Sequence, residues 1–180
     1  MKKKLLLLLS ALLMLLAANL RPCYALQVDG AELEELYSPA QLRRCEQKAL
    51  EAAEELLSGP AELPRAERRL ALRFQPARGD EAALTKALLL SVPGLCPADE
   101  VLINGTRLGT VEDGRELFER LRQSILNQMP NAAAVGNLSG RLQTRRVISR
   151  EGAQTNYEDM ILLITGMAPV IYVDNNGKLC

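Results

Sequence analysis

The sequence predicts an α+β fold of two tandem units, each a β-hairpin followed by a long helix, a strand and a short helix. An Asp-Gly pair at residues 29–30 and an Asn-Gly pair at residues 104–105 lie 75 positions apart, each after an apolar run. Such pairs supply the positive φ angles of a tight hairpin turn. The helix and strand signals that follow repeat at nearly the same offset. We therefore expect a first unit over residues 26–97 and a second over residues 98–180.

A helix-start signal follows each hairpin. Ser38 is followed three positions later by Gln41, and Asp113 by Glu116, which is the pattern of a capping box. Apolar residues then recur every three or four positions, which predicts one buried face on each helix. Burial in a core explains these stripes better than contact with a membrane or a partner. The stripes consist of Leu42, Cys45, Ala49, Ala52 and Leu56 in the first helix, and of Leu117, Leu121, Ile125 and Met129 in the second.

Strands and shorter helices complete each unit. Apolar and other residues alternate over residues 70–74, and less regularly over residues 142–148, which predicts a strand in each place. Asp80 begins one short helix, and the segment 155–158 begins the other with a second capping box. The apolar residues 169–173 predict a C-terminal strand that closes the sheet of the second unit, because an exposed apolar terminal strand would favour aggregation.

The first 25 residues are typical of a secretory signal peptide. Three lysines at positions 2–4 precede an apolar run from Leu5 to Leu16, which only Ser10 interrupts. Cys23 and Ala25 place small residues at the −3 and −1 positions of a cleavage site. Either the leader is cleaved after Ala25, or it is retained as an N-terminal anchor. Both outcomes predict a location outside the cytoplasm, in the cell envelope or secreted.

The charge balance changes when the leader is set aside. The whole chain has 22 basic and 22 acidic residues and no histidine, and four of the basic residues lie in the leader. The remainder therefore carries a net charge of about −4, which disfavours nucleic acid as a partner. The absence of histidine excludes Ser-His and Cys-His nucleophile pairs and histidine-ligated zinc.

Three cysteines follow the leader, at positions 45, 96 and 180. An odd number allows one disulfide with one free thiol, or three unpaired thiols. Cys96 is the residue that would form a bridge, to Cys45 or to Cys180. No Cys-x-x-Cys spacing is present, so the sequence predicts neither redox catalysis nor a thiolate metal site. We expect no metal and no cofactor.

One basic cluster is the candidate interaction patch, and it consists of Arg141, Arg145, Arg146 and Arg150. It is interpreted either as the solvated arginines of a strand, or as a contact for an anionic wall polymer or for the acidic surface of a partner. Glu158 and Asp159 are adjacent, but adjacent helix positions point in different directions, so these two acids do not form a catalytic pair. The sequence provides no catalytic residues that we can name.

The chain also resembles a known family over most of its length after the leader. The run from Val101 to Asp113 with its following helix, the segment Arg145–Ile148, and the helix that ends Leu163–Gly166 carry the resemblance. They are similar to the non-catalytic N-terminal region of clostridial exported cell-wall endopeptidases of the lysostaphin-type zinc class. The resemblance implies an accessory role in the cell envelope. It implies no peptidase activity, because the family's zinc-binding histidines have no counterpart here.

The sequence therefore predicts a secreted, non-enzymatic envelope protein that binds a partner protein or a component of the cell wall such as peptidoglycan. Membrane contact is expected only through an uncleaved leader. The alternatives are a glycan hydrolase that acts through carboxylates alone, and the remnant of a truncated cell-wall peptidase. A hydrolase would need two facing carboxylates in a cleft.

Overall fold

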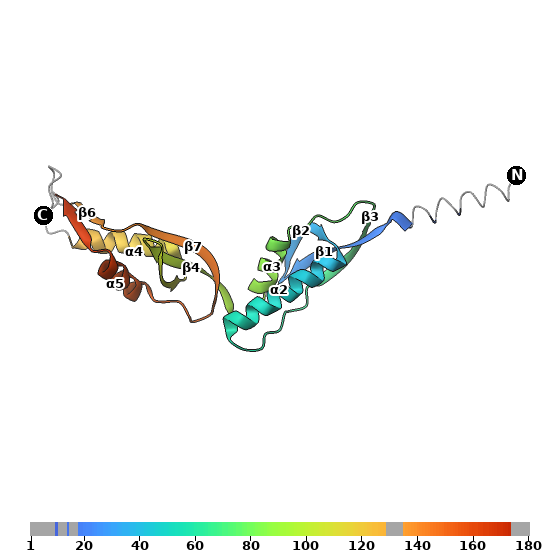
Figure 1. Ribbon diagram of the computed structural model, residues 1–180, viewed down its shortest axis with the longest axis horizontal. Coiled ribbons are helices and arrows are strands. Elements are labelled where there is room, and N and C mark those ends of the chain that lie inside the picture. Colours follow the sequence, from blue (N-terminus) through green and yellow to red (C-terminus); the bar gives the residue numbers. More distant parts are fainter. Residues whose placement is uncertain (1–9, 11–13, 15–17, 129–134, 174–180) are drawn as a thin grey trace. The chain divides into compact units, whose positions relative to one another are not determined.

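The computed structural model describes residues 10, 14, 18–128 and 135–173. The chain divides into two compact units, unit 1 from Met1 to Pro93 and unit 2 from Gly94 to Cys180. Helices and strands occur in both units, which confirms the α+β class (Figure 1). The division lies four residues before the predicted boundary at residue 97.

Unit 1 contains a three-stranded antiparallel sheet with two helices. Its strands lie in the order β2-β1-β3, so that the first strand is central. Strand β1 pairs with β2 through a hairpin and with β3 along seven residue pairs, from Arg21–Arg73 to Gln27–Glu67. The elements are β1 (Arg21–Val28), β2 (Ala31–Tyr37), α2 (Pro39–Leu57), β3 (Glu67–Arg73) and α3 (Glu81–Leu90).

Unit 2 has the same order of elements and the same arrangement of its main sheet. The strands lie in the order β5-β4-β7, again with the first strand central and antiparallel neighbours. A two-stranded sheet of β6 and β8 is additional. The elements are β4 (Leu95–Ile103), β5 (Thr106–Val111), α4 (Gly114–Asn127), β6 (Val135–Leu138), β7 (Leu142–Arg150), α5 (Tyr157–Met167) and β8 (Val170–Val173).

The expected C-terminal strand is present, but it does not extend the main sheet of unit 2. Strand β8 pairs with β6, with Val170 opposite Leu138, and the backbone N–H of Ser139 donates to the carbonyl of Pro169 at 3.1 Å. Four residues that contain a glycine and an asparagine give β6 too weak a pattern to reveal it in the sequence.

Both predicted hairpin turns are confirmed. Asp29 and Gly30 have φ angles of 50° and 79°, and Asn104 and Gly105 have φ angles of 51° and 83°. Two consecutive positive φ angles define the turn whose twist matches that of the flanking strands. The turns fix the registers Val28–Ala31 and Ile103–Thr106.

The predicted helix caps are confirmed at three of four helices. Ser38 and Gln41 form a complete capping box, and Asp80 and Asp113 each accept two backbone N–H bonds in the first turn of their helices. The fourth cap lies one residue later than predicted. Asn156, not the preceding threonine, accepts from the N–H of residue 159, and the backbone N–H of Thr155 instead donates to the carbonyl of Thr110 at 2.8 Å.

Each unit has its own aliphatic core, formed where the apolar helix faces meet the central strand. In α2 the fully buried residue after Ala49 is Ala53 rather than the predicted Ala52, and the predicted Ala52 and Leu56 are half-buried. In α4 the last predicted member, Met129, lies outside the described residues. The core of unit 1 contains Leu26, Val28, Tyr37, Leu42, Cys45, Ala49, Leu84 and Leu88, and that of unit 2 contains Val101, Ile103, Val111, Leu117, Leu121, Met160, Ile164 and Ala168.

The end of the predicted leader is part of unit 1. Residues 21–25 form the first five of the seven β1 positions that pair with β3, and the side chain of Cys23 is buried. The first strand of unit 1 therefore begins at Arg21 rather than at residue 26, and the expected cleavage site after Ala25 falls inside this central strand. Among the described residues, no helix is both long enough and apolar enough to cross a membrane.

Candidate interaction surfaces

The structure divides the predicted arginine patch between the two faces of a strand. Arg145, Arg146 and Arg150 belong to β7, and Arg141 immediately precedes it. Side chains of consecutive strand residues point to opposite faces, so Arg145 lies on one face and Arg146 on the other. The four arginines do not form one continuous basic surface.

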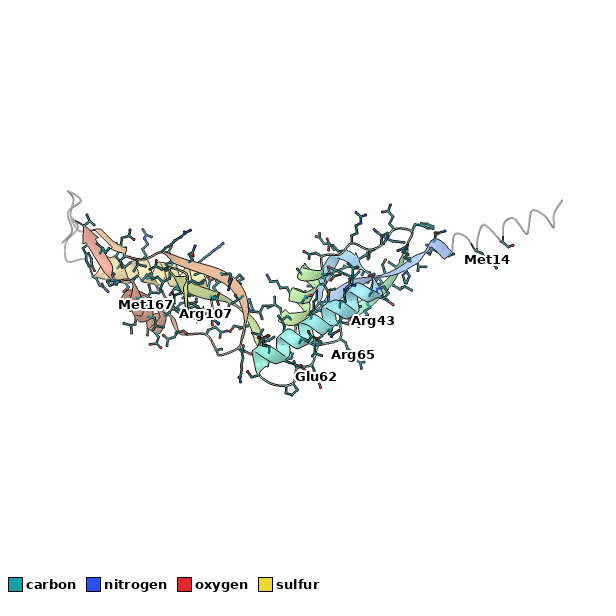
Figure 2. All side chains as sticks on the ribbon, viewed as in Figure 1. Met14, Arg43, Glu62, Arg65, Arg107 and Met167 are labelled. Atoms are coloured by element: carbon teal, nitrogen blue, oxygen red, sulfur yellow. The ribbon has the colours of Figure 1, made fainter. Side chains whose placement is uncertain are left out.

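Arg145 is held by a buried carboxylate. Glu100, whose side chain is 8% exposed, binds the guanidinium of Arg145 at 2.5 Å and that of Arg107 at 3.0 Å. Arg107, which Figure 2 labels, comes from β5 and Arg145 from β7, so the carboxylate on the central strand joins both edges of the sheet. Two opposite charges on either side satisfy the buried anion.

Arg146 is also paired, on the other face of the sheet. Its guanidinium lies 3.1 Å from Asp99, and the same carboxylate oxygen accepts the backbone N–H of Gly114 at 2.7 Å. Asp99 thereby joins β7 to the start of α4, where the helix dipole favours a negative charge. Of the four predicted arginines, Arg141 and Arg150 are the exposed ones for which the described residues provide no acidic partner.

The three described cysteines are free thiols. Cys23 and Cys45 are buried, and Cys96 is half-buried. Of the alternatives left open by the sequence, a bridge between Cys45 and Cys96 is therefore wrong, because Cys45 lies in the core of unit 1, where its thiol donates to the carbonyl of Glu81 at 3.6 Å. The alternative bridge to Cys180 lies outside the described residues. No group of three or more cysteine, aspartate or glutamate residues that could hold a metal occurs in the described part of the chain.

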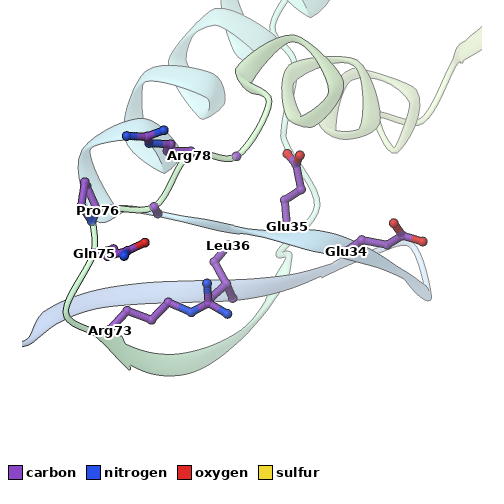
Figure 3. A pocket seen from close by; sticks show the side chains of 9 residues that line it. Glu34, Glu35, Leu36, Arg73, Gln75, Pro76 and Arg78 are labelled. Carbon is purple, nitrogen blue, oxygen red and sulfur yellow. The ribbon is translucent and has the colours of Figure 1, made fainter.

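A cleft of about 610 Å³ lies in unit 1 between β2, the end of β3 and the segment that connects β3 to α3. Figure 3 shows the side chains that line it. Its lining is polar and of mixed charge, and it consists of Glu34, Glu35, Leu36, Arg73, Gln75, Pro76, Ala77, Arg78 and Gly79.

One wall of the cleft depends on the close approach of Gly79 to Tyr37. A Cβ atom at Gly79 would lie 2.3 Å from Cε1 of Tyr37, so only glycine lets the connecting segment pack on this ring. Glu35 fixes the same segment by accepting the backbone N–H of Asp80 and by lying 3.5 Å from the Tyr37 hydroxyl. Burial, together with the Glu35 carboxylate, raises the pKa of Tyr37 to about 12.

Three charged side chains of the cleft have no charged partner among the residues that the structure describes. No ion pair of the described residues involves Glu34, Arg73 or Arg78. Glu35 is different, because its carboxylate is engaged with the connecting segment. The cleft therefore offers two free guanidinium groups and one free carboxylate to a ligand. Guanidinium groups favour carboxylates, and a carboxylate favours an ammonium group.

Sequence analysis did not identify this cleft. Its charged residues come from β2 and, about 40 positions later in the chain, from the end of β3 and the connecting segment. The one local signal is the stretch Gln75–Gly79, whose proline and glycine interrupt the strand pattern and indicate a loop. Nothing in that stretch indicates which strand it contacts.

The alternating apolar residues of β3 form an exposed strip rather than part of the core. Leu70, Leu72 and Phe74 are 59%, 58% and 60% exposed. Leu70 and Leu72 lie on one face of the strand, and Phe74 follows its last residue. We refer to these three residues as the β3 strip.

Comparison of the chain with protein-family models, with curated proteins and with solved structures finds no match. The resemblance to the N-terminal region of cell-wall endopeptidases stays a prediction. The surfaces described above are therefore the basis for a functional proposal.

Proposed function

We propose that the chain is a non-enzymatic accessory protein of the cell envelope that binds a peptide component of the cell wall in the cleft of unit 1. The leader and the resemblance to wall-associated proteins support the location. We infer the class of ligand from the free charges in the cleft, which belong to Arg73, Arg78 and Glu34. A short peptide with free carboxylates and a free amino group, such as the peptide stem of peptidoglycan, has the complementary charges.

The same cleft bears on the hydrolase alternative, because two glutamates line it. Glu34 and Glu35 are consecutive in β2, and their carboxylates point in different directions (Figure 3). Glu35 is also engaged with the N–H of Asp80. A glycosidase needs two facing carboxylates, one of them free to act as an acid. The arrangement favours binding over hydrolysis.

The proposal is tested by sedimentation of the purified full chain with isolated peptidoglycan sacculi. We expect the chain to sediment with the sacculi, and Arg73→Glu with Arg78→Glu to weaken binding at least about tenfold, because two favourable charges become repulsive. Arg43→Glu with Arg65→Glu is the matched control, since this double variant makes the same charge change at two exposed positions outside the cleft. Isolated stem peptides should compete with the sacculi.

Two results would contradict the proposal. Sacculi that fail to bind the chain, or that bind the double variant as well as the wild type, would exclude the cleft as the binding site. Release of soluble glycan fragments during the incubation, abolished by Glu34→Gln, would instead establish hydrolysis.

A further inference from the structure

Strand β3 is an edge strand of unit 1, and its outer edge is open. The sheet has the order β2-β1-β3, so β3 pairs with β1 on one side and with no strand of the described chain on the other. All of its residues except Ala71 are exposed. The unpaired N–H and C=O groups of such an edge are a template for a further strand. The side chains of β3 determine which strand fits there.

The leucines of β3 lie on the face of the sheet that α2 covers. Leu70 is opposite Tyr24, which packs against the core of unit 1. Arg68 lies on the same face and forms an ion pair with Glu46 of α2 at 2.6 Å. Alternation along the strand places Leu72 there as well. The core nevertheless leaves most of the surface of both leucines exposed, so an added strand could cover them.

The sequence of β3 is complementary to a second copy of itself. Two copies related by a two-fold axis perpendicular to the sheet pair antiparallel, with one residue opposite its own copy. Because Leu70 is the middle residue of β3, the register that pairs the whole strand sets Leu70 opposite Leu70. The other pairs in this register are Leu72 with Arg68, Ala71 with Arg69 and Arg73 with Glu67.

Charge favours this register over the alternatives. Centring the pair on any charged residue of β3 places that residue opposite its own copy, and like charges in opposite positions destabilise a sheet. Centring on Ala71 places Arg69 opposite Arg73, which is again a like pair. Centring on Leu72 leaves the first residues of β3 opposite the loop that follows the strand. The register centred on Leu70 contains no like pair.

The same register joins the apolar side chains of the two copies. Leu70 is opposite its own copy and diagonal to Leu72 of the second copy, positions whose side chains reach each other across a sheet. The four leucines therefore form one apolar cluster on the helix side. Arg68, which Glu46 holds, places its aliphatic stem opposite Leu72.

Opposite charges lie at the two ends of the pair, on the other face of the sheet. Glu67 of each copy is opposite Arg73 of the other, and the small Ala71 is opposite Arg69. Arg73 also lines the cleft of unit 1. Its guanidinium has several N–H donors in a fork, so an ion pair with Glu67 leaves donors for a ligand in the cleft.

Two other edge strands of the described chain lack this complementarity. The middle residue of β2, the second edge of unit 1, is Glu34, and that of β7 in unit 2 is Arg146. Pairing either whole strand with its own copy therefore places like charges opposite each other at the centre. In β3 the middle residue is apolar and the two end residues have opposite charges.

We propose that two copies of the chain associate by antiparallel pairing of their β3 strands, centred on Leu70. The two three-stranded sheets then form one continuous sheet with the helices of both copies on one face. A second copy is the occupant because β3 itself supplies the acidic residue for Arg73 and the small residue for Arg69. A single strand pair is a small interface, so we expect a Kd of about 10 µM. The association goes beyond the proposed function and does not depend on the ligand of the cleft.

Cysteine cross-linking of the full chain tests the register. Leu70→Cys, with Cys96→Ser and Cys180→Ser in the background, places a thiol opposite its own copy. Opposite residues of an antiparallel pair have Cα atoms about 4.5–5.5 Å apart, within the range of about 4.4–6.8 Å that a disulfide spans. Oxidation with copper phenanthroline above the expected Kd should convert most of the chain to a dimer that dithiothreitol reverses.

Leu72→Cys in the same background is the matched control. Leu72 lies on the same face as Leu70 and is equally exposed, at 58% against 59%. In the proposed register its two copies lie about 13 Å apart along the strands, so it should cross-link to itself at least about tenfold more slowly. A mixture of Leu72→Cys and Arg68→Cys chains should cross-link efficiently, because these two positions are opposite.

A charge swap tests the ends of the strand pair. On the Leu70→Cys background, Glu67→Arg should slow cross-linking about tenfold, because it places two arginines opposite each other at both ends. Addition of Arg73→Glu restores opposite charges and should restore the rate. Circular dichroism of each variant confirms that the chain remains folded.

Three results would overturn the proposal. Folded Leu70→Cys that stays monomeric above the expected Kd would exclude the pairing. Equal rates for Leu70→Cys and Leu72→Cys would show that the copies meet without this register. A charge swap that fails to restore the rate would exclude the contact between Glu67 and Arg73. None of these measurements involves sacculi, so each is distinguishable from a failure of the proposed function.

Discussion

Gly79→Ala should destabilise unit 1, because the new methyl group has no room. The Cβ atom would lie 2.3 Å and 2.5 Å from two ring carbons of Tyr37 and 2.9 Å from the carbonyl oxygen of Leu36. The shortest of these distances is 1.1 Å below the 3.4 Å of ordinary contact. The ring cannot move aside easily, since Tyr37 is 1% exposed and belongs to the core.

Overpacking of a core costs about 1–3 kcal/mol. We expect Gly79→Ala to lower the free energy of unfolding by about 2–3 kcal/mol, the upper part of this range, because a buried ring and a backbone carbonyl both clash with the methyl group. Hydrogen exchange of the folded chain, followed by mass spectrometry, measures the two units separately. Peptides from β1 and β2 should exchange faster by about 30–150-fold, and peptides from β4 should be unchanged.

Two controls make this result specific. Gly59→Ala, also in unit 1, has open space around its Cβ atom and should stay within about 0.5 kcal/mol of the wild type. Tyr37→Val removes the ring carbons that oppose the methyl group, so the double variant should be more stable than the sum of the single changes predicts, by about 1 kcal/mol. Additive effects, or a Gly79→Ala chain as stable as Gly59→Ala, would refute the packing argument.

Three further predictions concern single groups. The pKa of Tyr37 is near 10 in the unfolded chain and about 12 in the folded chain. The stabilisation linked to the protonated hydroxyl should therefore be present below pH 10 and lost between pH 10 and pH 12, and the alkaline unfolding of Tyr37→Phe should lack that loss. Asp113→Ala should cost about 1 kcal/mol by removing the acceptor of the Arg115 and Glu116 N–H groups, measured as faster exchange in α4 alone, and no change would contradict the cap. In a Cys180→Ser background, a thiol reagent should modify one cysteine of the folded chain, Cys96, and two more after unfolding; earlier modification of Cys23 or Cys45 would contradict their burial.

Local signals in the sequence were sufficient to predict the helices and the strands other than β6. The Asp-Gly and Asn-Gly pairs require positive φ angles wherever they lie between strands, and the Ser38 box satisfies helix N–H groups within four residues. Both effects depend only on near neighbours. This explains why the hairpins and the helix starts were predicted, and why the order of the main strands and helices was predicted in both units.

The surfaces depend on register and on tertiary contacts, which local patterns do not contain. Alternation along β3 indicates a strand with an apolar face, but not that the face of Leu70 and Leu72 remains uncovered. The arginines of β7 are consecutive in the sequence, and only the register with β4 assigns Arg145 to Glu100 and Arg146 to Asp99. The cleft residues meet because the connecting segment crosses to β2, a contact that no spacing predicts.

Because β1 is the central strand of its sheet, folding of unit 1 would block access of a signal peptidase to the predicted cleavage site. The bond after Ala25 lies in a strand with hydrogen-bonded neighbours on both sides, at β2 and at β3. A signal peptidase cleaves an extended and accessible segment, so it can act only before β3 has paired. Cleavage then removes five of the seven β1 positions that pair with β3. In the export that we propose, competition between strand pairing and proteolysis would determine whether the cell obtains a tethered, complete unit 1 or a released chain without five of the eight residues of its central strand.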